Sequence, residues 1–437
     1  MLFRLAPRPA ATARFLGSAS AGPLRIALLV YRGNPQCGGQ GVYVRYLSRA
    51  LADLGHSVEV FSGPPYPVLD AGVVLTKVPG LDLYRQPDPF RMPRLTEFRS
   101  PIDVAEFALM CTAGFPEPLT FSLRVQHLLR RRLDEFDVLH DNQCLGYGLL
   151  PLLRSRVPVV ATIHHPITVD RRLDLGAARQ LRKRLALWRW YGFTRMQRRV
   201  ARRVPRILTV SDTSWRDLVD ELGIDPARLH TVPLGVDTER FRPLGRPRIT
   251  GRLLTTASAD VPLKGLLHLI EALPRLRRRH PQAHLVVVGR PNPDGPVPKT
   301  IRRLGLQKVV RFEHRVSDER LVELYAEAEA AVVPSLYEGF SLPAVEAMAS
   351  GCALVVSDTA ALPEVVGQSG EAALLVRPGE PGQLAAALDV VLSDSELRER
   401  LGAAGRQRAL EHFSWPVTAA ATVEHYRAAI VAQVARC

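Results

Sequence analysis

The stretch that decides the fold is Ser335–Gly351, which reads SLYEGFSLPAVEAMASG. It follows a short apolar run, Ala330–Val333, which predicts a buried strand. Pro343 suits the first position of a helix, and Gly351 suits the residue after a helix ends. The stretch therefore predicts a strand, a loop and a short helix.

Two carboxylates lie in this stretch. Glu338 falls in the predicted loop and Glu346 in the first turn of the predicted helix, with seven residues between them. Parallel sheets bind ligands at the carboxyl ends of their strands. The open amides of Ser341 and Leu342, at the positive end of the helix dipole, suit a diphosphate. Because carboxylates accept hydrogen bonds from sugar hydroxyls, the combination predicts a nucleotide-sugar site.

Length and composition limit the class of protein. A chain of 437 residues is too long for one ordinary core, so we expect two domains. A hydrophobic content of 46% with 23% charged residues is typical of a globular protein, and no run reaches the ~18 apolar residues of a membrane span. The five cysteines are scattered and odd in number, which disfavours a disulfide framework and a zinc site and fits a reducing cytoplasm.

Apolar runs alternate with helical patterns along both halves of the chain, which predicts right-handed βαβ units and parallel sheets. Predicted strands fall at 24–30, 55–61, 73–78, 137–140, 158–166, 206–211, 253–257, 284–288, 309–312, 330–333, 353–356 and 373–376. Predicted helices fall at 42–54, 121–136, 264–280, 317–329, 343–350 and 383–392, with a last amphipathic helix after residue 415. Residues 79–120 show no clear period, so we expect loops and short helices there.

The motif P-S-x-x-E-G-F-x-L-P-x-x-E-A-M-A-x-G, which starts at Pro334, resembles the E-x7-E signature of family 4 retaining glycosyltransferases. These belong to the glycogen synthase-like and phosphatidylinositol mannosyltransferase-like superfamily. Val232–Pro243 resembles the family's V-P-N-G-V-D-x-x-x-F-x-P link between domains, with Leu234 in place of Asn. The resemblance is firm over 207–415 and looser over 79–200. It implies an α/β protein of the GT-B fold, with two Rossmann-like, doubly wound domains and the active site in the cleft between them.

The resemblance also implies a division of the chain. Residues 1–23 lack the apolar core of a secretory signal, and we expect a disordered extension there, with a mis-called start as the alternative. We expect an acceptor domain over 24–242 and a nucleotide-sugar domain over 243–414. A helix over 415–437 would cross back onto the first domain, as in other GT-B proteins.

The family pattern assigns three catalytic candidates, which are Glu338, Lys264 and His164, and a donor-binding Glu346. In the family the first Glu contacts the donor sugar and the second holds the nucleotide ribose, so these roles pass to Glu338 and Glu346. Lys264, in the segment VPLKG, matches the Lys that binds the diphosphate. His164 matches by position the active-site His that contacts the transferred sugar, whereas His165 is not covered by the match.

A glycine-rich loop, CGGQG, follows the first predicted strand. Such a loop lets a ligand approach the backbone, although an ordinary turn would also explain it. Family members carry a Gly-Gly loop here, near the donor phosphate and the acceptor, and contact the base mostly through backbone near the positions of Arg315 and Val316. The predicted donor-binding residues are Gly38, Gly39, Gly41, Lys264, Arg290, Val316, Phe340, Ser341, Leu342 and Glu346.

One expected cation is missing. Family members usually place an Arg shortly before the Lys, but the corresponding positions here are Ser258 and Ala259, followed by Asp260. Arg290 follows the strand at 285–288, and its guanidinium could take two phosphate oxygens in place of the missing Arg. The alternative is a solvated loop residue.

The chain has no D-x-D motif of the kind that holds a metal in many glycosyltransferases. The resemblance implies metal-independent, retaining transfer of a hexosyl group from a nucleotide-diphosphate sugar to a hydroxyl acceptor, lipid-linked or small. We expect no cofactor beyond the donor as co-substrate. A catalytically weak relative that binds a nucleotide sugar or a partner remains as the alternative.

The chain carries a net charge of +15, part of it concentrated in residues 179–206. This segment holds ten Arg, one Lys and no acid, interleaved with Trp, Tyr, Phe and Leu. It suits an anionic membrane surface or an anionic acceptor, while a solvated helix face and nucleic-acid binding are the alternatives. We expect a cytoplasmic protein, peripheral on the inner face of the membrane, and no nucleic-acid partner.

Overall fold

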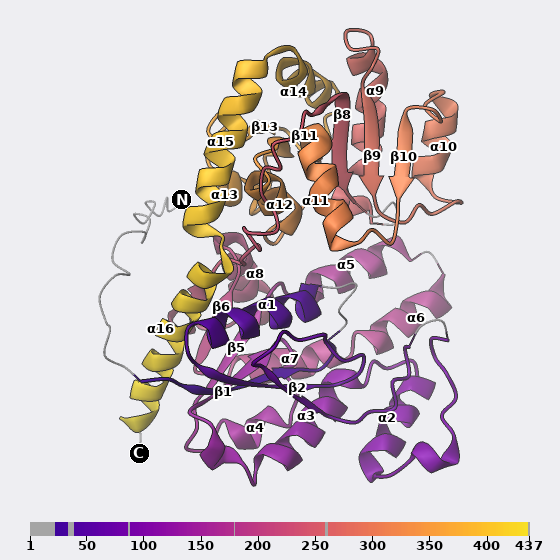
Figure 1. The fold of residues 1–437 in the computed structure, drawn as a ribbon. Coiled ribbons are helices and arrows are strands. Elements are labelled where there is room, and N and C mark those ends of the chain that lie inside the picture. Colours follow the sequence, from indigo (N-terminus) through magenta and orange to yellow (C-terminus); the bar gives the residue numbers. More distant parts are fainter. Residues whose placement is uncertain (1–21, 34–38, 86–87, 179, 258–260, 436–437) are drawn as a thin grey trace, which may run out of the picture.

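The computed structural model describes residues 22–33, 39–85, 88–178, 180–257 and 261–435. These residues form two parallel sheets, each with helices on both faces, in two domains that lie one above the other in Figure 1. The predicted architecture of two doubly wound α/β domains is confirmed. The predicted extension falls almost wholly outside the described residues.

The first sheet has the strand order β3-β2-β1-β4-β5-β6-β7. β1 lies between β2 and β4, so the direction of winding reverses between β1 and β4, which is where sheets of this kind bind ligands. The strands are β1 Arg25–Val30, β2 Ser57–Ser62, β3 Val74–Lys77, β4 Val138–Asn142, β5 Val159–Ile163, β6 Arg206–Thr209 and β7 Leu229–Thr231. The sequence did not predict β7, which has only three residues.

The second sheet has the order β10-β9-β8-β11-β12-β13, and its winding reverses between β8 and β11. Its strands are β8 Ile249–Thr256, β9 His284–Val288, β10 Val310–Glu313, β11 Ala328–Val333, β12 Ala353–Ser357 and β13 Leu374–Val376. They lie where the sequence predicted them. Their central residues are buried because helices cover both faces of the sheet.

The helices of the first domain are α1 Gly39–Asp53, α2 Pro101–Cys111, α3 Glu117–Leu129, α4 Leu149–Leu152, α5 Ile167–Ala177, α6 Leu181–Trp190, α7 Phe193–Ala201 and α8 Asp212–Leu222. Those that follow are α9 Leu266–Arg277, α10 Pro296–Arg303, α11 Asp318–Glu327, α12 Leu342–Ala349, α13 Leu362–Val366, α14 Pro381–Ser393, α15 Ser395–His412 and α16 Trp415–Val434. The helix predicted over 121–136 is wrong in extent. α3 ends earlier because the chain turns to bring Phe136 into the core against Phe61, 5.8 Å between ring centroids.

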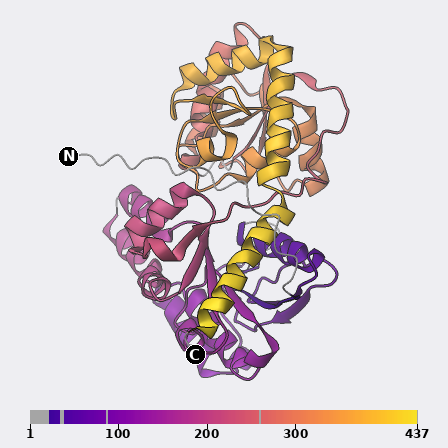
Figure 2. The same cartoon turned by 90° about the vertical axis from the view of Figure 1, so that its left-hand side faces the viewer.

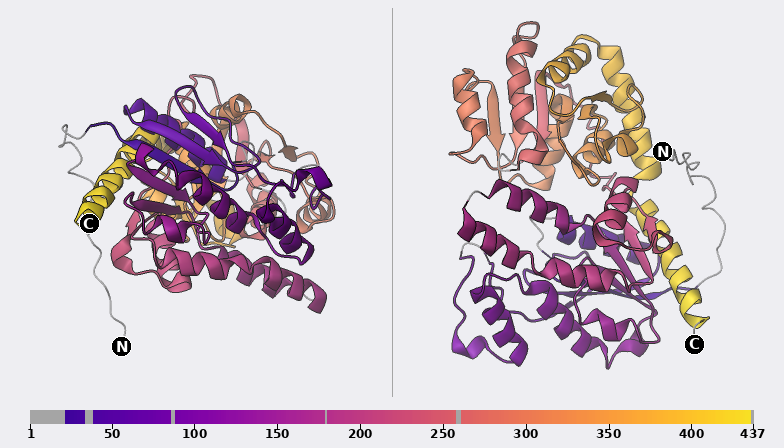
Figure 3. Two further views of the ribbon diagram at one scale, coloured as in Figure 1. Left: turned by 90° about the horizontal axis from the view of Figure 1, so that it is seen from below. Right: turned by 180° about the vertical axis from the view of Figure 1, so that it is seen from behind.

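The last helix joins the two domains. α16 leaves the second domain and runs along the first, as Figures 2 and 3 show. Its buried hydrophobic residues share one apolar core with α1 and the first sheet; they are Trp415, Ala419, Val423, Tyr426 and Ala429. β7 ends at Thr231 and β8 begins at Ile249, so the boundary that we propose at 242–243 lies in the segment between the sheets.

A buried hydrogen-bonded chain fixes α16 on the first domain. The Tyr426 hydroxyl lies 2.5 Å from His140 Nδ1, and His140 Nε2 lies 2.7 Å from Thr162 Oγ1. Burial lowers the pKa of His140 to about 3, so the ring is neutral and each nitrogen has one partner. A buried polar group in an apolar core is costly unless it is paired in this way.

The Tyr426→Phe variant should lower the free energy of unfolding by about 1–3 kcal/mol, because it leaves a buried His140 nitrogen without a partner. Urea unfolding followed by circular dichroism measures this change. Tyr66→Phe is the matched control, since the contact of its ring with Lys77 survives the substitution. Equal stability of the two variants would contradict the assigned role of the Tyr426 hydroxyl.

Candidate active site

The centre of the site is an ion pair between the loops that follow β8 and β11. Lys264 Nζ donates to both carboxylate oxygens of Glu338, at 2.8 and 3.0 Å. Ser335 Oγ donates to the same carboxylate at 2.7 Å. Glu338 is buried, whereas the Lys264 side chain is 35% exposed. Because an ammonium group has three donors, Lys264 can bind a further anion while it keeps Glu338 in place.

Local geometry at Gly265 brings the two loops together. Gly265 has φ of +66°, and a Cβ on this residue would lie 1.9 Å from the carbonyl oxygen of Pro334. The amide of Leu336 donates to the carbonyl of Leu263 at 2.7 Å. Only glycine permits this close approach, which holds Lys264 next to the loop of Glu338.

The helix that follows Glu338 begins at the edge of the sheet where the strands end. Ser341 is the N-cap of α12, and its side chain accepts a hydrogen bond from the amide of Ala344 at 3.4 Å. Leu342 is the first helical residue, so Pro343 occupies the second helical position rather than the predicted first. Phe340 is buried with its ring 5.7 Å from that of Phe413, which leaves only its backbone for a ligand.

Glu346 is the fifth residue of α12, one position beyond the predicted first turn. The Tyr325 hydroxyl donates to Glu346 Oε2 at 3.0 Å and also lies 3.2 Å from the carbonyl of Pro343. Burial raises the pKa of Glu346 to about 7, against the lowering effect of the Tyr325 hydrogen bond. Sequence reasoning did not single out Tyr325, because its position on α11 fits an ordinary buried helix face.

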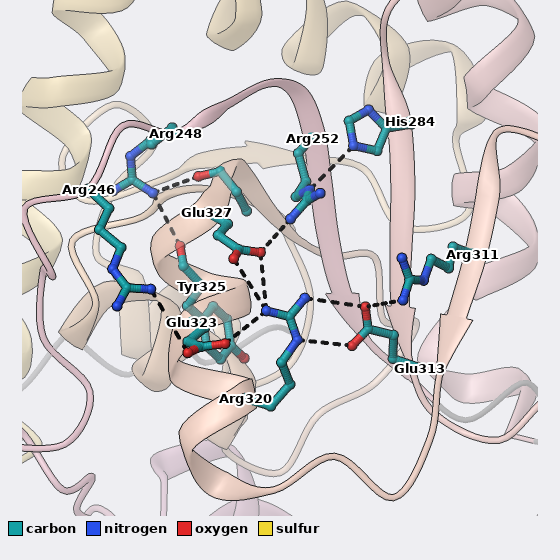
Figure 4. A network of polar contacts seen from close by, with 11 residues as sticks. Arg246, Arg248, Arg252, His284, Arg311, Glu313, Arg320, Glu323, Tyr325 and Glu327 are labelled. Atoms are coloured by element: carbon teal, nitrogen blue, oxygen red, sulfur yellow. Dashed lines mark hydrogen bonds and ion pairs between the residues drawn. The ribbon is translucent and has the colours of Figure 1, made fainter.

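A network of charges holds the helix that carries Tyr325 (Figure 4). Arg248, in the segment before β8, donates to the carbonyls of Tyr325 and Ala328 at 3.2 and 2.6 Å and to that of Gly351 at 2.6 Å. α12 ends at Ala349, and Gly351 follows its C-cap residue, Ser350. One guanidinium therefore ties the ends of α11 and α12 together, which fixes Tyr325 relative to Glu346.

His164 lies at the carboxyl end of β5 in the first domain. Its Nε2 lies 2.8 Å from Asn142 Oδ1, and its amide donates to Gln143 Oε1 at 2.7 Å. The Tyr43 ring packs edge-on against it, 4.7 Å between centroids. Burial, together with neighbouring His165, lowers the pKa of His164 to about 3. The ring is therefore neutral and can only donate and accept hydrogen bonds.

The glycine-rich loop leads into α1. Gly39 is the first residue of the helix and Gly41 the third, while Gly38 lies outside the described residues. Asn142 Nδ2 donates to the carbonyl of Gln40 at 3.4 Å, which joins the start of α1 to the end of β4. The start of α1 and Asn142, the partner of His164, therefore meet at the point where the winding of the first sheet reverses.

The two domains touch at Gly339, the residue after Glu338. Its carbonyl accepts hydrogen bonds from Ser211 Oγ at 2.6 Å and Ser214 Oγ at 3.1 Å, both in the first domain. A Cβ on Gly339 would lie 3.6 Å from the carbonyl oxygen of His164. The loop that carries Glu338 is thus in contact with the strand end that carries His164.

A carboxylate of the second domain strengthens this contact. Glu364 accepts hydrogen bonds from the amides of Asp212 and Thr213 at 2.7 and 2.8 Å. These amides open α8, so the carboxylate caps a helix of the other domain, where the dipole favours negative charge. Glu364 is not visible in the sequence pattern because its partner lies about 150 residues away in the chain.

The remaining predicted residues lie at the edges of the site. Arg290 is exposed just after β9, at the same end of the sheet as Lys264. Val316 is half-buried against the second-domain core, and Arg315 beside it has φ of +56°. Ser258, Ala259 and Asp260 lie outside the described residues. Among the residues that the structure does describe, no cluster of His, Cys, Asp or Glu side chains could hold a metal ion.

The basic segment divides into two helices. Met196, Val200 and Ala201 of α7 are buried in the first-domain core. α6 has no buried residue, and Leu181, Leu185 and Trp188 are 73%, 61% and 47% exposed. Across the described ranges, no helix has both the length and the apolar character needed to cross a bilayer.

Comparisons with known proteins agree with this geometry. The model of Glycosyltransferase Family 4 matches residues 37–240, and that of Glycosyl transferases group 1 matches residues 239–408. The "MMP alpha-(1->4)-mannosyltransferase" of Mycolicibacterium hassiacum is 54% identical, over 95% of this chain and 100% of its own length. A D-inositol 3-phosphate glycosyltransferase 2 of Catenulispora acidiphila is 31% identical, over 93% of this chain and 96% of its own.

Solved structures share the fold. Sucrose-phosphate synthase from Thermosynechococcus elongatus superposes with a TM-score of 0.71 at 22% identity, over 93% of this chain and 100% of that one. Anabaena HepE, in complex with UDP and glucose, gives a TM-score of 0.66 at 18% identity, over 92% of this chain and 99% of the HepE chain. Two matched domain models, a relative with more than half of its residues identical and the shared fold place the chain among the family 4 glycosyltransferases with the GT-B fold.

Proposed function

We propose that this glycosyltransferase moves a mannosyl group from a nucleotide-diphosphate sugar to a hydroxyl acceptor, with retention of the anomeric configuration. The observation that carries the proposal is the pairing of Lys264 with Glu338 beside the start of α12. A cation and open helix amides suit the leaving diphosphate, and a buried carboxylate suits a sugar hydroxyl. A nucleotide sugar contains both groups, an anionic diphosphate and a neutral sugar.

The second domain would hold the donor. Lys264 and the amides of Ser341 and Leu342 would bind the diphosphate, with Arg290 as a second cation from the end of β9. Glu338 would accept a hydrogen bond from the sugar, and Glu346 would accept hydrogen bonds from the ribose. The backbone near Val316 would meet the base. In this way fixed cations and dipoles, rather than a bound metal, would offset the charge that develops on the leaving group.

The first domain would bring the acceptor to the same carbon. His164 is neutral, so it would bind a hydroxyl of the transferred sugar without exchanging a proton. The bond from the anomeric carbon to the diphosphate oxygen breaks while the acceptor oxygen bonds to the same face. The proton of the acceptor hydroxyl passes to the departing phosphate oxygen. This route needs no strong protein base.

The name of a relative suggests the sugar. The Mycolicibacterium hassiacum relative is named an alpha-(1->4)-mannosyltransferase, and the Anabaena structures contain UDP or UDP-glucose. Incubation with GDP-, UDP- and ADP-linked mannose and glucose, read by mass spectrometry of product and released nucleotide, tests the donor. We expect one mannosyl donor to be turned over, with an α-linked product from an α-linked donor. Binding without turnover of any donor would instead favour a catalytically weak relative.

We further propose that α6 binds an anionic membrane surface. Its exposed apolar residues, Leu181, Leu185 and Trp188, recur at the spacing of one helix face, and Arg182, Lys183 and Arg184 are exposed beside them. Trp190 anchors the end of the helix against Phe115, 5.0 Å between ring centroids. The predicted membrane-binding segment was 179–206. We now propose α6 alone as the binding surface, because the apolar side chains of α7 lie in the core.

Glu338→Gln should lower turnover while donor affinity holds, because Lys264 keeps its charge for the diphosphate. Glu346→Gln should instead weaken donor binding by ~1.5–3 kcal/mol, since the ribose loses a charged partner. Calorimetry and steady-state kinetics separate the two effects, with the exposed Glu396→Gln as control.

The pH dependence gives a second readout of Glu346. With a pKa of about 7, its carboxylate is charged above pH 7 and protonated below it, so wild-type donor affinity should fall as the pH drops from 8 to 6. Glu346→Gln should lose this part of the pH dependence. Unchanged kinetics and affinity in both Gln variants would refute the assigned roles.

Lys264→Ala and Arg290→Ala should each lower turnover, on the order of 10²–10³-fold if each removes one group that stabilises the leaving charge. The fold-loss of turnover in the double variant should be smaller than the product of the two single fold-losses, because both cations act on one diphosphate. Arg302→Ala, on the exposed face of α10, is the control. Full activity of Arg290→Ala would show that Lys264 and the helix amides suffice.

Replacing Arg182, Lys183 and Arg184 by Gln should reduce sedimentation with phosphatidylglycerol vesicles. At about 1 kcal/mol per basic residue near an anionic surface, three changes weaken binding roughly 100-fold. Arg189 is left intact because it donates to the carbonyl of Thr112 at the end of α2. Replacing Lys299, Arg302 and Lys308 by Gln removes the same charge from the second domain. Equal loss in both triple variants, or equal sedimentation with neutral vesicles, would contradict a docking surface on α6.

A further inference from the structure

A second histidine lies next to His164, and its side chain makes a different contact. His165 Nε2 lies 2.9 Å from Asp170 Oδ2, and both side chains are 43% exposed. Asp170 lies in the first turn of α5. The carbonyl of His165 accepts a hydrogen bond from Gln143 Nε2 at 2.8 Å, which fixes the backbone at the end of β5. The pair is therefore held at a defined place and still reaches solvent.

The carboxylate determines which ring nitrogen of His165 carries the proton. A carboxylate accepts a hydrogen bond and cannot donate one, so the ring proton of the neutral histidine lies on Nε2. Nδ1 then has a lone pair that can accept a hydrogen bond. A hydroxyl group can donate a hydrogen bond to this lone pair. An ionised phosphate oxygen cannot, because it carries lone pairs of its own and no hydrogen.

The pair lies beside the loop that carries Glu338. A Cβ on Gly339 would lie 3.8 Å from the Cβ of His165. Asp170 is also close enough to Tyr337 for its charge to help raise the pKa of the Tyr337 hydroxyl, after burial and Asp217. Figure 1 shows α5 at the border between the domains. The His165 imidazole therefore belongs to the first-domain side of the site, next to the proposed place of the donor sugar.

We infer that His165, oriented by Asp170, binds a hydroxyl of a saccharide acceptor through Nδ1. The inference rests on the proposed transfer reaction and adds to it the chemical class of the acceptor. His164, one residue earlier, is held by its contacts with Asn142 and Tyr43, whereas the His165 side chain contacts Asp170 and is 43% exposed. Two neighbouring residues after β5 would thus bind different substrates: His164 would bind the donor sugar, and His165 would bind the acceptor.

The test compares transfer to a sugar with transfer to water in the full-length protein. The probes are α-(1→4)-linked mannotetraose as acceptor and the donor that the wild type uses. His165→Ala should raise the KM for mannotetraose roughly three- to tenfold, the effect expected from one lost hydrogen bond, and leave donor hydrolysis and donor KM unchanged. His165→Asn should restore part of the loss, because its Oδ1 lies near the position of Nδ1. Asp170→Asn should give a KM for mannotetraose between those of the wild type and His165→Ala, since an Asn side chain no longer fixes the ring proton of His165 on Nε2.

A matched control exists in the second domain. His280 Nε2 lies 2.8 Å from Asp389 Oδ1, in the same kind of pair but before β9, at the opposite end of the sheet from Lys264. Asp389→Asn should leave the KM for mannotetraose unchanged. Circular dichroism and nucleotide binding confirm that each variant is folded.

Three results would overturn the inference. An unchanged KM for mannotetraose in His165→Ala would show that the His165–Asp170 pair is an ordinary solvated pair. Equal losses of transfer and of donor hydrolysis would show that the substitution acts on donor binding or on the fold. A wild type that hydrolyses its donor but does not glycosylate mannotetraose would exclude this acceptor class, although the proposed donor chemistry would stand. A wild type that neither transfers nor hydrolyses any donor would overturn the proposed function and the inference together.

Discussion

The close approach of Gly265 to the carbonyl oxygen of Pro334 is the constraint on which the site depends. It brings the loop after β8 against the loop after β11, at the point where the winding of the second sheet reverses. Without it, Lys264 would have no fixed place next to Glu338. Burial of the Glu338 carboxylate costs desolvation free energy, and the donors from Lys264 and Ser335 offset that cost, while the ammonium remains partly open to solvent.

The same loop connects the site to the first domain. The carbonyl of Gly339 accepts hydrogen bonds from two serine hydroxyls of the first domain, and Glu364 caps a helix of that domain. In the other direction, the Tyr337 hydroxyl donates to Asp217 of the first domain. The polypeptide crosses between the domains a second time through α16, whose Tyr426 is bonded to His140 inside the first-domain core. These contacts hold His164 and Glu338 on adjoining surfaces, as a transfer between two substrates requires.

Much of the fold could be predicted because parallel sheets covered on both faces give continuous apolar runs, and these are visible in the sequence. The short strand β7 was missed because three residues carry too little pattern. The predicted helix over 121–136 was too long because the turn before Phe136 depends on its contact with Phe61, which is remote in sequence. Local pattern predicts elements well and their ends less well, because tertiary contacts decide where an element stops.

For the candidate site, sequence reasoning predicted residues whose proposed roles rest on their own side-chain chemistry, and it missed residues that hold such a neighbour in place. Glu338 and Lys264 stand in recognisable motifs, and the structure brings them together. Tyr325, which bonds to Glu346, and Arg248, which ties two helix ends together, have no motif, because their partners are set by packing between distant elements. Phe340 falls inside a motif, yet its ring serves the core.

The most direct test of the account is a crystal structure with a nucleotide-diphosphate mannose bound. The account predicts diphosphate oxygens within hydrogen-bonding distance of Lys264 Nζ and of the amides that open α12, with the ribose hydroxyls on Glu346 and a sugar hydroxyl on Glu338. A diphosphate bound away from Lys264, or a ribose held by residues other than Glu346, would contradict it.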